Sequence, residues 1–209
     1  HQTGGRGRMG RSFVSPPGGL YLSMLLSPRC TPEASLSLTP CAAVAVQRAI
    51  ARLSDVQTGI KWPNDLLVDG KKVCGILCES LFYQGQQKLI VGVGLNVNTP
   101  PEAFTGELSA LAGSLFSVTG RELSIQKAAE ALITELDRMY ADWQSDHRCC
   151  LEEYKRSCVN LKRPVLLIRG EEKIKAYAEG IDDNYALMVR HESGEPETIK
   201  MGEVSLRNI

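Results

Sequence analysis

Apolar positions along the chain follow two patterns, and each predicts a different kind of element. Residues 20–26 form a short continuous apolar run after a Pro-Pro-Gly-Gly turn signal, as a buried strand does. From residue 124 to 143 apolar side chains recur at intervals of three and four, which predicts one face of an amphipathic helix. Small and apolar residues over 35–53 favour another helix, packed on a sheet.

Three further apolar stretches, residues 60–68, 73–81 and 88–93, predict additional strands. The dipeptide Asp69-Gly70 lies between the first two and is a strong signal for a tight hairpin turn. We therefore expect a meander of antiparallel strands. The apolar stretches of the chain are too short to cross a bilayer, so no membrane segment is expected.

After about residue 162 the pattern changes to short β-rich runs separated by turn clusters. Five such runs in a short segment predict a small barrel. The segment 146–158 reads as a helical connection, so we expect a larger domain over residues 1–160 and a small one over 161–209. The predicted strands of the small domain are residues 164–168, 174–181, 186–190, 198–200 and 204–206.

Composition narrows the range of partners. Lys and Arg together number 24 and Asp and Glu also number 24, so the chain has no excess charge for non-specific binding to nucleic acid or anionic membranes. Any anion must therefore be bound by a local cluster. The seven cysteines are an odd number without C-x-x-C spacing, which predicts reduced thiols in a cytoplasmic protein and neither a zinc site nor a disulfide framework.

The first segment whose residues indicate a chemical function is the Gly/Arg loop, residues 4–11, with the sequence GGRGRMGR. Glycines let backbone N–H groups turn toward an anion, and guanidinium groups bind phosphate or carboxylate in a bidentate way. A flexible basic loop or an RNA-binding Gly/Arg tract is the alternative. The tract stops after one copy and runs directly into a folded segment, which favours the anion site.

The second segment, KWPNDLL at residues 61–67, has one lysine at the start of an otherwise apolar strand. A lysine entering a buried sheet needs an anionic partner, so Lys61 is either paired within the fold or bound to a ligand's carboxylate or phosphate. Trp62 is better explained by packing than by ligand stacking. Asp65 either caps the turn or holds a metal.

The third segment, VGVGLNVN at residues 91–98, ends a strand with two glycines and two asparagines. Glycines allow a flat ligand to approach the backbone closely, and an asparagine amide can contact the donor and acceptor edge of adenine. A strand that simply ends in a turn is the alternative.

The order of these segments and their residue sequences together resemble those of the biotin protein ligase family. That family has a G-R-G-R-x-G-R loop, an S-P-x-G-G-L-Y-L-S strand, K-W-P-N-D-L, G-K-K-x-x-G-I-L-x-E, V-G-x-G-x-N-x-N and a terminal G-E-V-S-L-R. Here the motifs stand at residues 5–11, 15–23, 61–66, 70–79, 91–98 and 202–207. The resemblance implies an α+β fold, with a central mixed sheet and flanking helices as in class II aminoacyl-tRNA synthetases, followed by an SH3-like barrel.

The resemblance also implies roles for individual residues. Arg6 and Arg8 correspond to arginines of the loop over biotinyl-adenylate, and Lys61 to the lysine that bridges the biotin carboxylate and the α-phosphate; these three are the expected catalytic residues. Phe13 stands where some relatives have a tryptophan against adenine, and Asn96 where adenine is contacted. Arg8, Arg11, Phe13 and Asn96 thus form the expected adenylate site, and Gln2, Gly5, Arg6, Lys61, Gly75, Ile76 and Leu77 the expected biotin site.

The activity implied is ATP-dependent formation of biotinyl-5′-AMP, followed by transfer of biotin to a lysine of a biotin carboxyl carrier domain. ATP and biotin would be the substrates, and Mg²⁺ would screen the leaving pyrophosphate. The residues that would hold the metal are not identified. Relatives are often homodimers, so we expect a homodimer if this chain self-associates.

Two departures from the family pattern matter. No winged-helix DNA-binding domain precedes His1, and the family's catalytic domain begins about thirty residues earlier, with a biotin-contacting turn. We therefore expect the chain as written to bind biotin poorly, and strand 20–26 to lack a neighbour. Two rival functions follow: a truncated or degenerate homologue that binds biotin or its adenylate without completing transfer, and a lipoate-type protein ligase.

Overall fold

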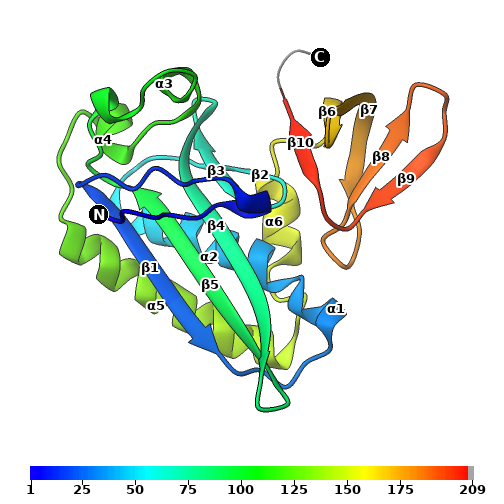
Figure 1. The fold of residues 1–209 in the computed structure, drawn as a ribbon, viewed down its shortest axis with the longest axis horizontal. Helices are drawn as coiled ribbons and strands as arrows, with labels where there is room; N and C mark the ends of the chain where they lie inside the picture. Colours follow the sequence, from blue (N-terminus) through cyan, green and yellow to red (C-terminus); the bar gives the residue numbers. More distant parts are fainter. Residues whose placement is uncertain (207–209) are drawn as a thin grey trace.

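Two antiparallel sheets joined by helices make up the molecule (Figure 1). The structure is a computed structural model and describes residues 1–206. The larger sheet has the strand order β1-β5-β4-β3-β2, and the C-terminal sheet has the order β10-β6-β7-β8-β9. The strands are β1 (Gly19–Leu26), β2 (Gly59–Lys61), β3 (Asp65–Val68), β4 (Lys71–Tyr83), β5 (Gln86–Asn96), β6 (Arg163–Arg169), β7 (Glu172–Ile181), β8 (Leu187–His191), β9 (Pro196–Ile199) and β10 (Glu203–Ser205).

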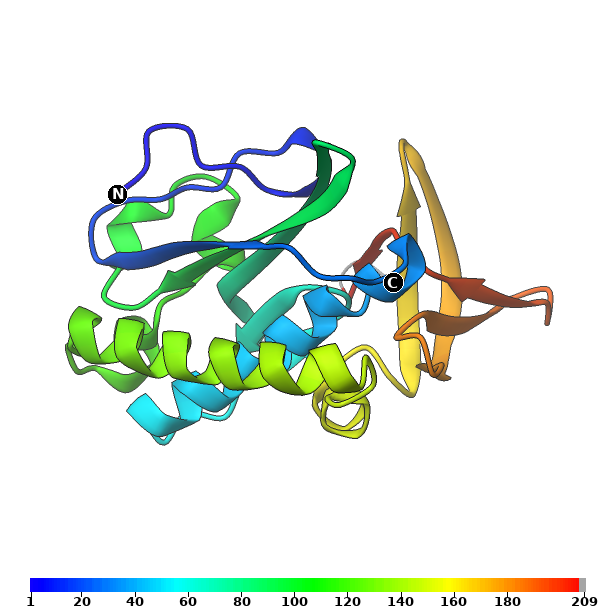
Figure 2. The ribbon, with the colours of Figure 1, turned by 90° about the horizontal axis from the view of Figure 1, so that it is seen from below.

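Helices cover one face of the larger sheet. Figure 2 shows α2 and α5 running beneath it, while the N-terminal segment crosses the opposite face. The 3₁₀ turn η1 belongs to that segment. The helices and 3₁₀ turns are η1 (Arg8–Gly10), α1 (Pro32–Ser35), α2 (Leu38–Leu53), η2 (Pro101–Ala103), α3 (Leu108–Leu111), α4 (Leu115–Thr119), α5 (Ile125–Ser145) and α6 (Leu151–Ser157).

Several predictions from periodicity are confirmed. The apolar run at residues 20–26 is β1, and the 3–4 repeat is α5, whose buried stripe includes Leu132, Leu136 and Trp143. The dipeptide Asp69-Gly70 makes the hairpin between β3 and β4, with φ of 48° and 76°. Positive φ at both central residues is what a two-residue hairpin turn requires, which explains the glycine.

Three expectations need correction. The apolar stretch 60–68 is two strands, because residues 62–64 turn the chain so that β2 and β3 pair with each other. The larger sheet is antiparallel in every ladder, and parallel pairing among the described residues is limited to the bridges Ile60–Cys158 and Lys72–Ala112. No ladder joins β9 to β10 in the described part of the chain, so the C-terminal domain is an antiparallel sheet without a closing ladder.

The core of the larger domain lies between the sheet and its two long helices. α2 contributes ten buried residues, most of them small, so it can approach α5 and the sheet closely. Trp143 of α5 is fully buried, and its indole N–H donates to the Ser37 hydroxyl at 2.7 Å. A buried aromatic side chain with its polar atom satisfied contributes about 3–5 kcal/mol to stability, judged by typical truncations to alanine.

Helices α1 and α2 form a segment, Pro32–Leu53, that is long and apolar enough by composition to cross a membrane. The single apolar stretches expected from the sequence are shorter than this segment, which meets the length criterion only as a whole. The burial of α2 against α5 and the sheet accounts for its apolar character, because a central core helix has the same composition.

The C-terminal sheet is joined to the catalytic part by buried polar contacts. The Trp62 indole N–H donates to the Tyr185 carbonyl at 3.0 Å, and the Trp62 backbone N–H donates to Asn160 Oδ1 at 2.7 Å. The Tyr154 hydroxyl donates to the carbonyl of Pro63 at 3.1 Å. Trp62 is thus a packing residue, as predicted, and it fixes the turn between β2 and β3 against the second domain.

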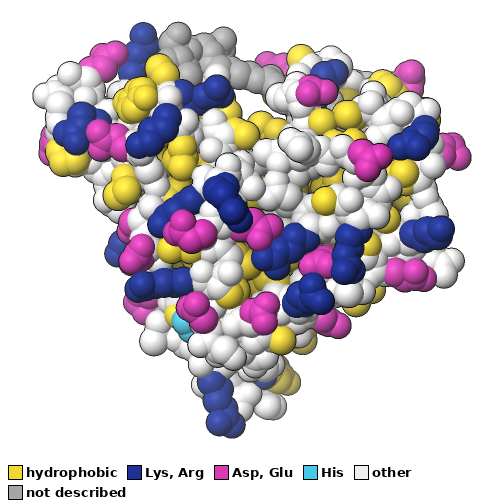
Figure 3. Space-filling view, turned by 180° about the vertical axis from the view of Figure 1, so that it is seen from behind, with side chains coloured by type: hydrophobic (Ala, Val, Ile, Leu, Met, Phe, Trp, Pro, Cys, Tyr) yellow, Lys and Arg dark blue, Asp and Glu magenta, His cyan; other side chains and the backbone are white. Residues whose placement is uncertain are grey.

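Charges of both signs are mixed over the surface. On the face shown in Figure 3, Lys and Arg side chains alternate with Asp and Glu, and no wide patch of one sign is visible. This distribution agrees with the formal net charge of +0. The anion-binding potential of the molecule therefore lies in local clusters.

Candidate active site

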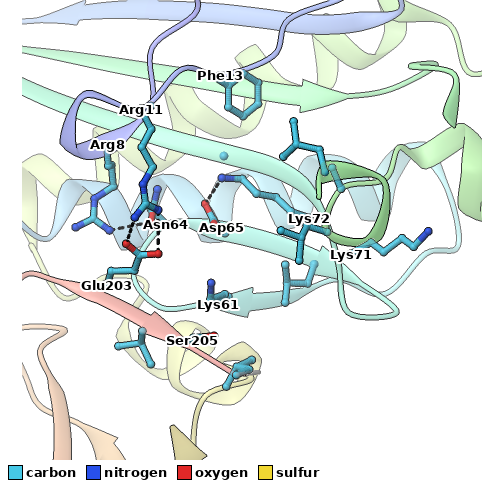
Figure 4. A pocket seen from close by; sticks show the side chains of 18 of the residues that line it. Arg8, Arg11, Phe13, Lys61, Asn64, Asp65, Lys71, Lys72, Glu203 and Ser205 are labelled. Atoms are coloured by element: carbon cyan, nitrogen blue, oxygen red, sulfur yellow. Dashed lines mark hydrogen bonds and ion pairs between the residues drawn. The ribbon is translucent and has the colours of Figure 1, made fainter. Parts of the chain in front are cut away.

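A cavity of about 1380 Å³ opens between the N-terminal loop, the strands β2 to β4, the segment around α3 and the strand β10. Figure 4 shows that basic side chains from three of these elements lie in its wall. Segments distant in sequence therefore build one site, and its chemistry depends on which side chains they bring together.

The Gly/Arg loop is a turn with its own backbone hydrogen bonds. The N–H of Gly7 donates to the Arg11 carbonyl at 2.7 Å, and the N–H of Phe13 donates to the Gly5 carbonyl at 2.9 Å. A Cβ atom on Gly5 would lie 2.3 Å from the Phe13 carbonyl oxygen, so only glycine fits there. The loop thus has a defined, hydrogen-bonded conformation, unlike the flexible basic loop that was the alternative.

Two arginines of this loop bind groups of other elements. Arg8 donates to Asn64 Oδ1 at 3.1 Å and to the Gly202 carbonyl at 3.0 Å. Arg11 donates with both terminal nitrogens to the two carboxylate oxygens of Glu203. Burial lowers the pKa of Arg8, and the hydrogen bond to Glu203 raises the pKa of Arg11. Both guanidinium groups remain charged at neutral pH, because an arginine side chain is not deprotonated in proteins.

Lys61 lies at the end of β2, where the sequence had placed it at the start of a strand. It is half-buried in the cavity wall, on the same side as Glu203 (Figure 4). The pKa of Glu203 is lowered first by the hydrogen bond from Arg11, and the charges of Lys61 and Arg8 lower it further. The Glu203 carboxylate of the C-terminal domain therefore pairs with Arg11 and lies within electrostatic range of Lys61 and Arg8 of the larger domain.

Phe13 rests on the glycines of two neighbouring strands. A Cβ atom on Gly94 would lie 2.5 Å from the Phe13 ring, and one on Gly75 would lie 3.1 Å from it. The Lys72 ammonium lies 5.6 Å from the ring centroid and 2.7 Å from Asp65 Oδ1. The glycines thus make a flat floor for an aromatic ring, with a cation beside it.

Asn96 ends β5 in the wall of the same cavity and is 3% exposed. Its amide nitrogen donates to the Gly113 carbonyl at 2.9 Å, whereas Oδ1 is buried and has no hydrogen-bond partner among the described residues. A buried acceptor without a partner is costly unless a ligand supplies a donor. An amino group on a flat heterocycle is a suitable donor.

The structure brings most of the predicted site residues together. The large cavity is lined by Arg8, Arg11, Phe13, Lys61, Gly75, Ile76, Leu77 and Asn96. Gln2 and Gly5 line a second cavity of about 400 Å³, which shares residues 12–14 with the first. Arg6 is exposed and lines neither of these cavities. The expected biotin residues are therefore divided between two cavities, and the Gln2 side chain accepts from the Ser15 hydroxyl at 2.9 Å.

Sequence reasoning missed four residues of the site: Asn64, Asp65 as a partner of Lys72, Lys72 itself and Glu203. Lys72 follows the hairpin turn, where a lysine is commonly solvated, but it lines the cavity because Asp65 of the paired strand attracts it. Glu203 belongs to the terminal G-E-V-S-L-R motif, so a signal was present, but its partners are up to 195 residues away. The last residue of that motif, Arg207, lies outside the described residues.

Comparisons with known proteins identify the family of the chain. Residues 1–96 match the family model described as "Biotin/lipoate A/B protein ligase family", and residues 161–207 match "Biotin protein ligase C terminal domain". The chain is 32% identical over 215 residues to a biotin--[acetyl-CoA-carboxylase] ligase of Paracoccus denitrificans, covering 97% of this chain and 86% of that protein.

The chain belongs to the biotin protein ligase family. The fold agrees with a solved member, the biotin protein ligase of Aquifex aeolicus in complex with biotin and ATP, with a TM-score of 0.85 and 29% identity. That match covers 98% of this chain and 84% of the other. These biotin protein ligases share both the α+β catalytic fold and the C-terminal all-β domain.

A second relative shows how lengths vary within the biotin protein ligase family. The bifunctional ligase/repressor BirA of Bacillus subtilis is 37% identical over 146 residues, which are 69% of this chain and 45% of that protein. This chain thus spans about half the length of the bifunctional relatives that it matches.

Proposed function

We propose that this chain activates biotin with ATP to biotinyl-5′-AMP and transfers biotin to a lysine of a biotin carboxyl carrier domain. The observation that carries the proposal is that Arg8, Arg11 and Lys61 line one cavity wall, where Arg11 already pairs with the Glu203 carboxylate. Guanidinium and ammonium groups gathered at one wall have the charge and the donors to hold a carboxylate or a phosphate.

The second support is the neighbouring nucleotide subsite. Phe13 on its glycine floor offers an apolar face, and the buried Asn96 Oδ1 atom lacks a donor. An adenine ring has a flat face and an exocyclic amino group that can donate to Asn96. The cation cluster and this subsite line the same cavity, as a mixed anhydride of a carboxylate and AMP requires.

In the first step of the proposed reaction a biotin carboxylate oxygen attacks the α-phosphorus of ATP, and the bond to the bridging oxygen of pyrophosphate breaks. Negative charge grows on the phosphate oxygens as this happens. Lys61 and Arg8 would stabilise that charge, and preorganised donors of this kind contribute about 3 kcal/mol each. No protein nucleophile takes part, since the substrate carboxylate is itself the nucleophile.

In the second step the ε-amino group of the carrier lysine attacks the acyl carbon, and AMP leaves with the electron pair of the anhydride bond. The amine loses a proton to solvent. The charge left on AMP is again met by the cation cluster, so one set of side chains serves both steps.

Mg²⁺ is implied for the first step because ATP phosphates carry it. The carboxylates of Asp65 and Asp69 line the cavity, and one or two carboxylates together with substrate phosphates are the usual ligands of Mg²⁺. These residues fit the ion, which would screen the charge of the leaving pyrophosphate when bound. Reduced thiols suggest a cytoplasmic setting for the reaction.

Two alternatives are separated by one experiment. Pyrophosphate release is measured with ATP and biotin, then with ATP and lipoate, and the product is presented to a biotin carboxyl carrier domain. We expect pyrophosphate release with ATP and biotin and none with ATP and lipoate. The mass of the carrier domain should then increase by one biotinyl group. Release without carrier modification would favour a binding homologue, and faster release with lipoate would favour a lipoate-type ligase.

A further inference from the structure

Three cysteine thiols meet at a place remote from the proposed active site. The Sγ atoms of Cys41, Cys149 and Cys150 all lie within 4.8 Å of one another, and those of Cys149 and Cys150 are 3.7 Å apart. Cys41 lies in the first turn of α2, and the other two directly precede α6. Cys41 and Cys150 are buried and Cys149 is half-buried, so the cluster has one side open to solvent.

The spacing of these sulfur atoms suits a thiophilic metal ion. Zinc binds thiolate sulfur at about 2.3 Å in a tetrahedral arrangement, which places ligand sulfurs about 3.8 Å apart. The observed separations reach this geometry through small rotations of side chains. The open side at Cys149 leaves a position for a fourth ligand from solvent, and soft thiolate ligands favour zinc over magnesium or calcium.

Groups around the cluster support a bound cation. Asp142 and Asp146 are close enough to act electrostatically on Cys149, and Arg48 is close enough to feel the charge of Cys150. Three thiolates and one divalent zinc ion carry a net charge of −1, a smaller buried charge than three thiolates alone; the nearby Arg48 is paired with Glu153. A monovalent metal ion would leave a larger uncompensated charge in a mostly buried place.

Tyr185 connects the cluster to the C-terminal sheet. Its hydroxyl lies 3.3 Å from Cys41 Sγ, and its ring packs edge-on against Tyr154 with centroids 5.5 Å apart. The Tyr185 carbonyl accepts the hydrogen bond from Trp62. A hydrogen bond from outside the ligand set orients metal ligands in many sites, and here it would come from the second domain.

We propose that Cys41, Cys149 and Cys150 form a zinc-binding site within the larger domain, beside the contact that the Tyr185 hydroxyl of the C-terminal domain makes with Cys41. Binding replaces the thiol protons, which pass to solvent, and no oxidation takes place. The sequence predicted no zinc site because no pair of cysteines has C-x-x-C spacing. The site escapes such a pattern because Cys41 is supplied by a helix more than a hundred residues away.

The test uses the whole chain, freed of metal by a chelator and kept reduced, with Co²⁺ as a spectroscopic probe. We expect one equivalent of Co²⁺ to bind with a thiolate-to-cobalt charge-transfer band, and Zn²⁺ to displace it. Zn²⁺ should also raise the unfolding temperature, because it binds the folded state. Cys149→Ser should weaken metal binding by roughly 10–100-fold or more, the loss seen even for partners outside the ligand set.

Cys30→Ser is the matched control, since Cys30 is also half-buried but lies outside the cluster. It should leave the charge-transfer band and the affinity unchanged. Cys149→Ser is preferred to Cys41→Ser because a change at the buried helix position can disturb folding. A cobalt complex without the charge-transfer band, or equal losses in the Cys149 and Cys30 variants, would overturn the proposal.

Discussion

At the scale of single residues, the role of each charged side chain in the site depends on the group with which it pairs. Lys61 and Arg8 were recognisable from their motifs, and both lie in the cavity. Lys72 carries the same charge in the same region, but Asp65 holds it beside Phe13. The two lysines therefore have different surroundings, and a lysine outside the cavity is the better control for experiments on Lys61.

Lys61→Ala should lower the rate of biotin-dependent pyrophosphate release by roughly 100–1000-fold, the usual cost of removing one preorganised donor. The reason is that Lys61 lies in the cation cluster that would meet the α-phosphate. Lys127→Ala, an exposed position on α5, should leave the rate unchanged. Equal rates in the two variants would show that Lys61 is not the catalytic lysine.

Gly94→Ala should weaken ATP binding, because the new Cβ atom would lie 2.5 Å from the Phe13 ring and displace it. Gly92→Ala is a matched control on the same strand, where the nearest atom would be an ordinary 3.5 Å away. Calorimetric titration with ATP in the presence of biotin measures both. Unchanged affinity in Gly94→Ala would mean that the ring position does not matter for the nucleotide.

The ion pair between Arg11 and Glu203 should stabilise the fold at neutral pH and lose its effect in acid. The folded-state pKa of Glu203 lies below its ordinary 4.5, so its contribution is present above that value and disappears as the pH falls through the lowered pKa. Glu203→Gln should reduce the free energy of unfolding by about 0.2–1 kcal/mol at pH 7, since Arg11 is 62% exposed.

The measurement is denaturant unfolding of both proteins at a series of pH values. The difference between them should be constant near neutrality and shrink below pH 4.5. A difference that grows in acid has the wrong sign for this ion pair.

At the scale of elements, turns as well as strand ends position the functional groups. The turn between β2 and β3 carries Asn64, which is 8% exposed and accepts from Arg8. The Gly/Arg loop closes on itself and then contacts β10 through Arg8 and Arg11. A loop held by a few polar contacts can tighten or loosen when a ligand competes for the same side chains.

Biotinyl-adenylate should slow amide exchange in residues 4–11, because phosphate contacts offset the entropy lost when a glycine-rich loop is ordered. Gly7 is already hydrogen-bonded to Arg11, so the change should be largest at the other amides of the loop. Exchange monitored by mass spectrometry tests this. Arg8→Ala should weaken adenylate retention more than biotin binding; unchanged exchange in the wild-type loop would contradict the expectation.

At the scale of the whole molecule, the docking of two domains and the exposed edge of β1 determine how the site is completed and how chains can associate. The C-terminal sheet contributes Glu203 and the Gly202 carbonyl to the cavity, so the site is complete only when the domains are docked. Among the described residues β1 pairs with β5 alone, which leaves its other side as an edge. Such an edge favours pairing with another chain.

We expect the chain to self-associate through the edge of β1, with a homodimer as the simplest state. Leu25 is 69% exposed on this strand, and Leu25→Lys should shift the protein toward monomer because edge lysines oppose strand pairing. Ile133→Lys on α5 is the control, since that residue is 46% exposed away from the edge. Sedimentation velocity distinguishes the two; a monomeric wild-type protein would rule out this surface.

The sequence by itself determined the elements whose signals are local. Periodicity identified α5 and β1, Asp69-Gly70 identified a hairpin, and the ordered motifs identified the family and eight of the residues that line the large cavity. These succeed because burial on one face and turn geometry are fixed within a few residues of chain.

Only the tertiary structure decided which distant groups meet. It paired Glu203 with Arg11, held Lys72 against Asp65, and left Asn96 Oδ1 without a partner. It also divided the predicted biotin residues between two cavities and gathered three cysteines into one cluster. None of these follows from local pattern, because ion pairs and ligand sites depend on distances between segments that only packing of the whole chain establishes.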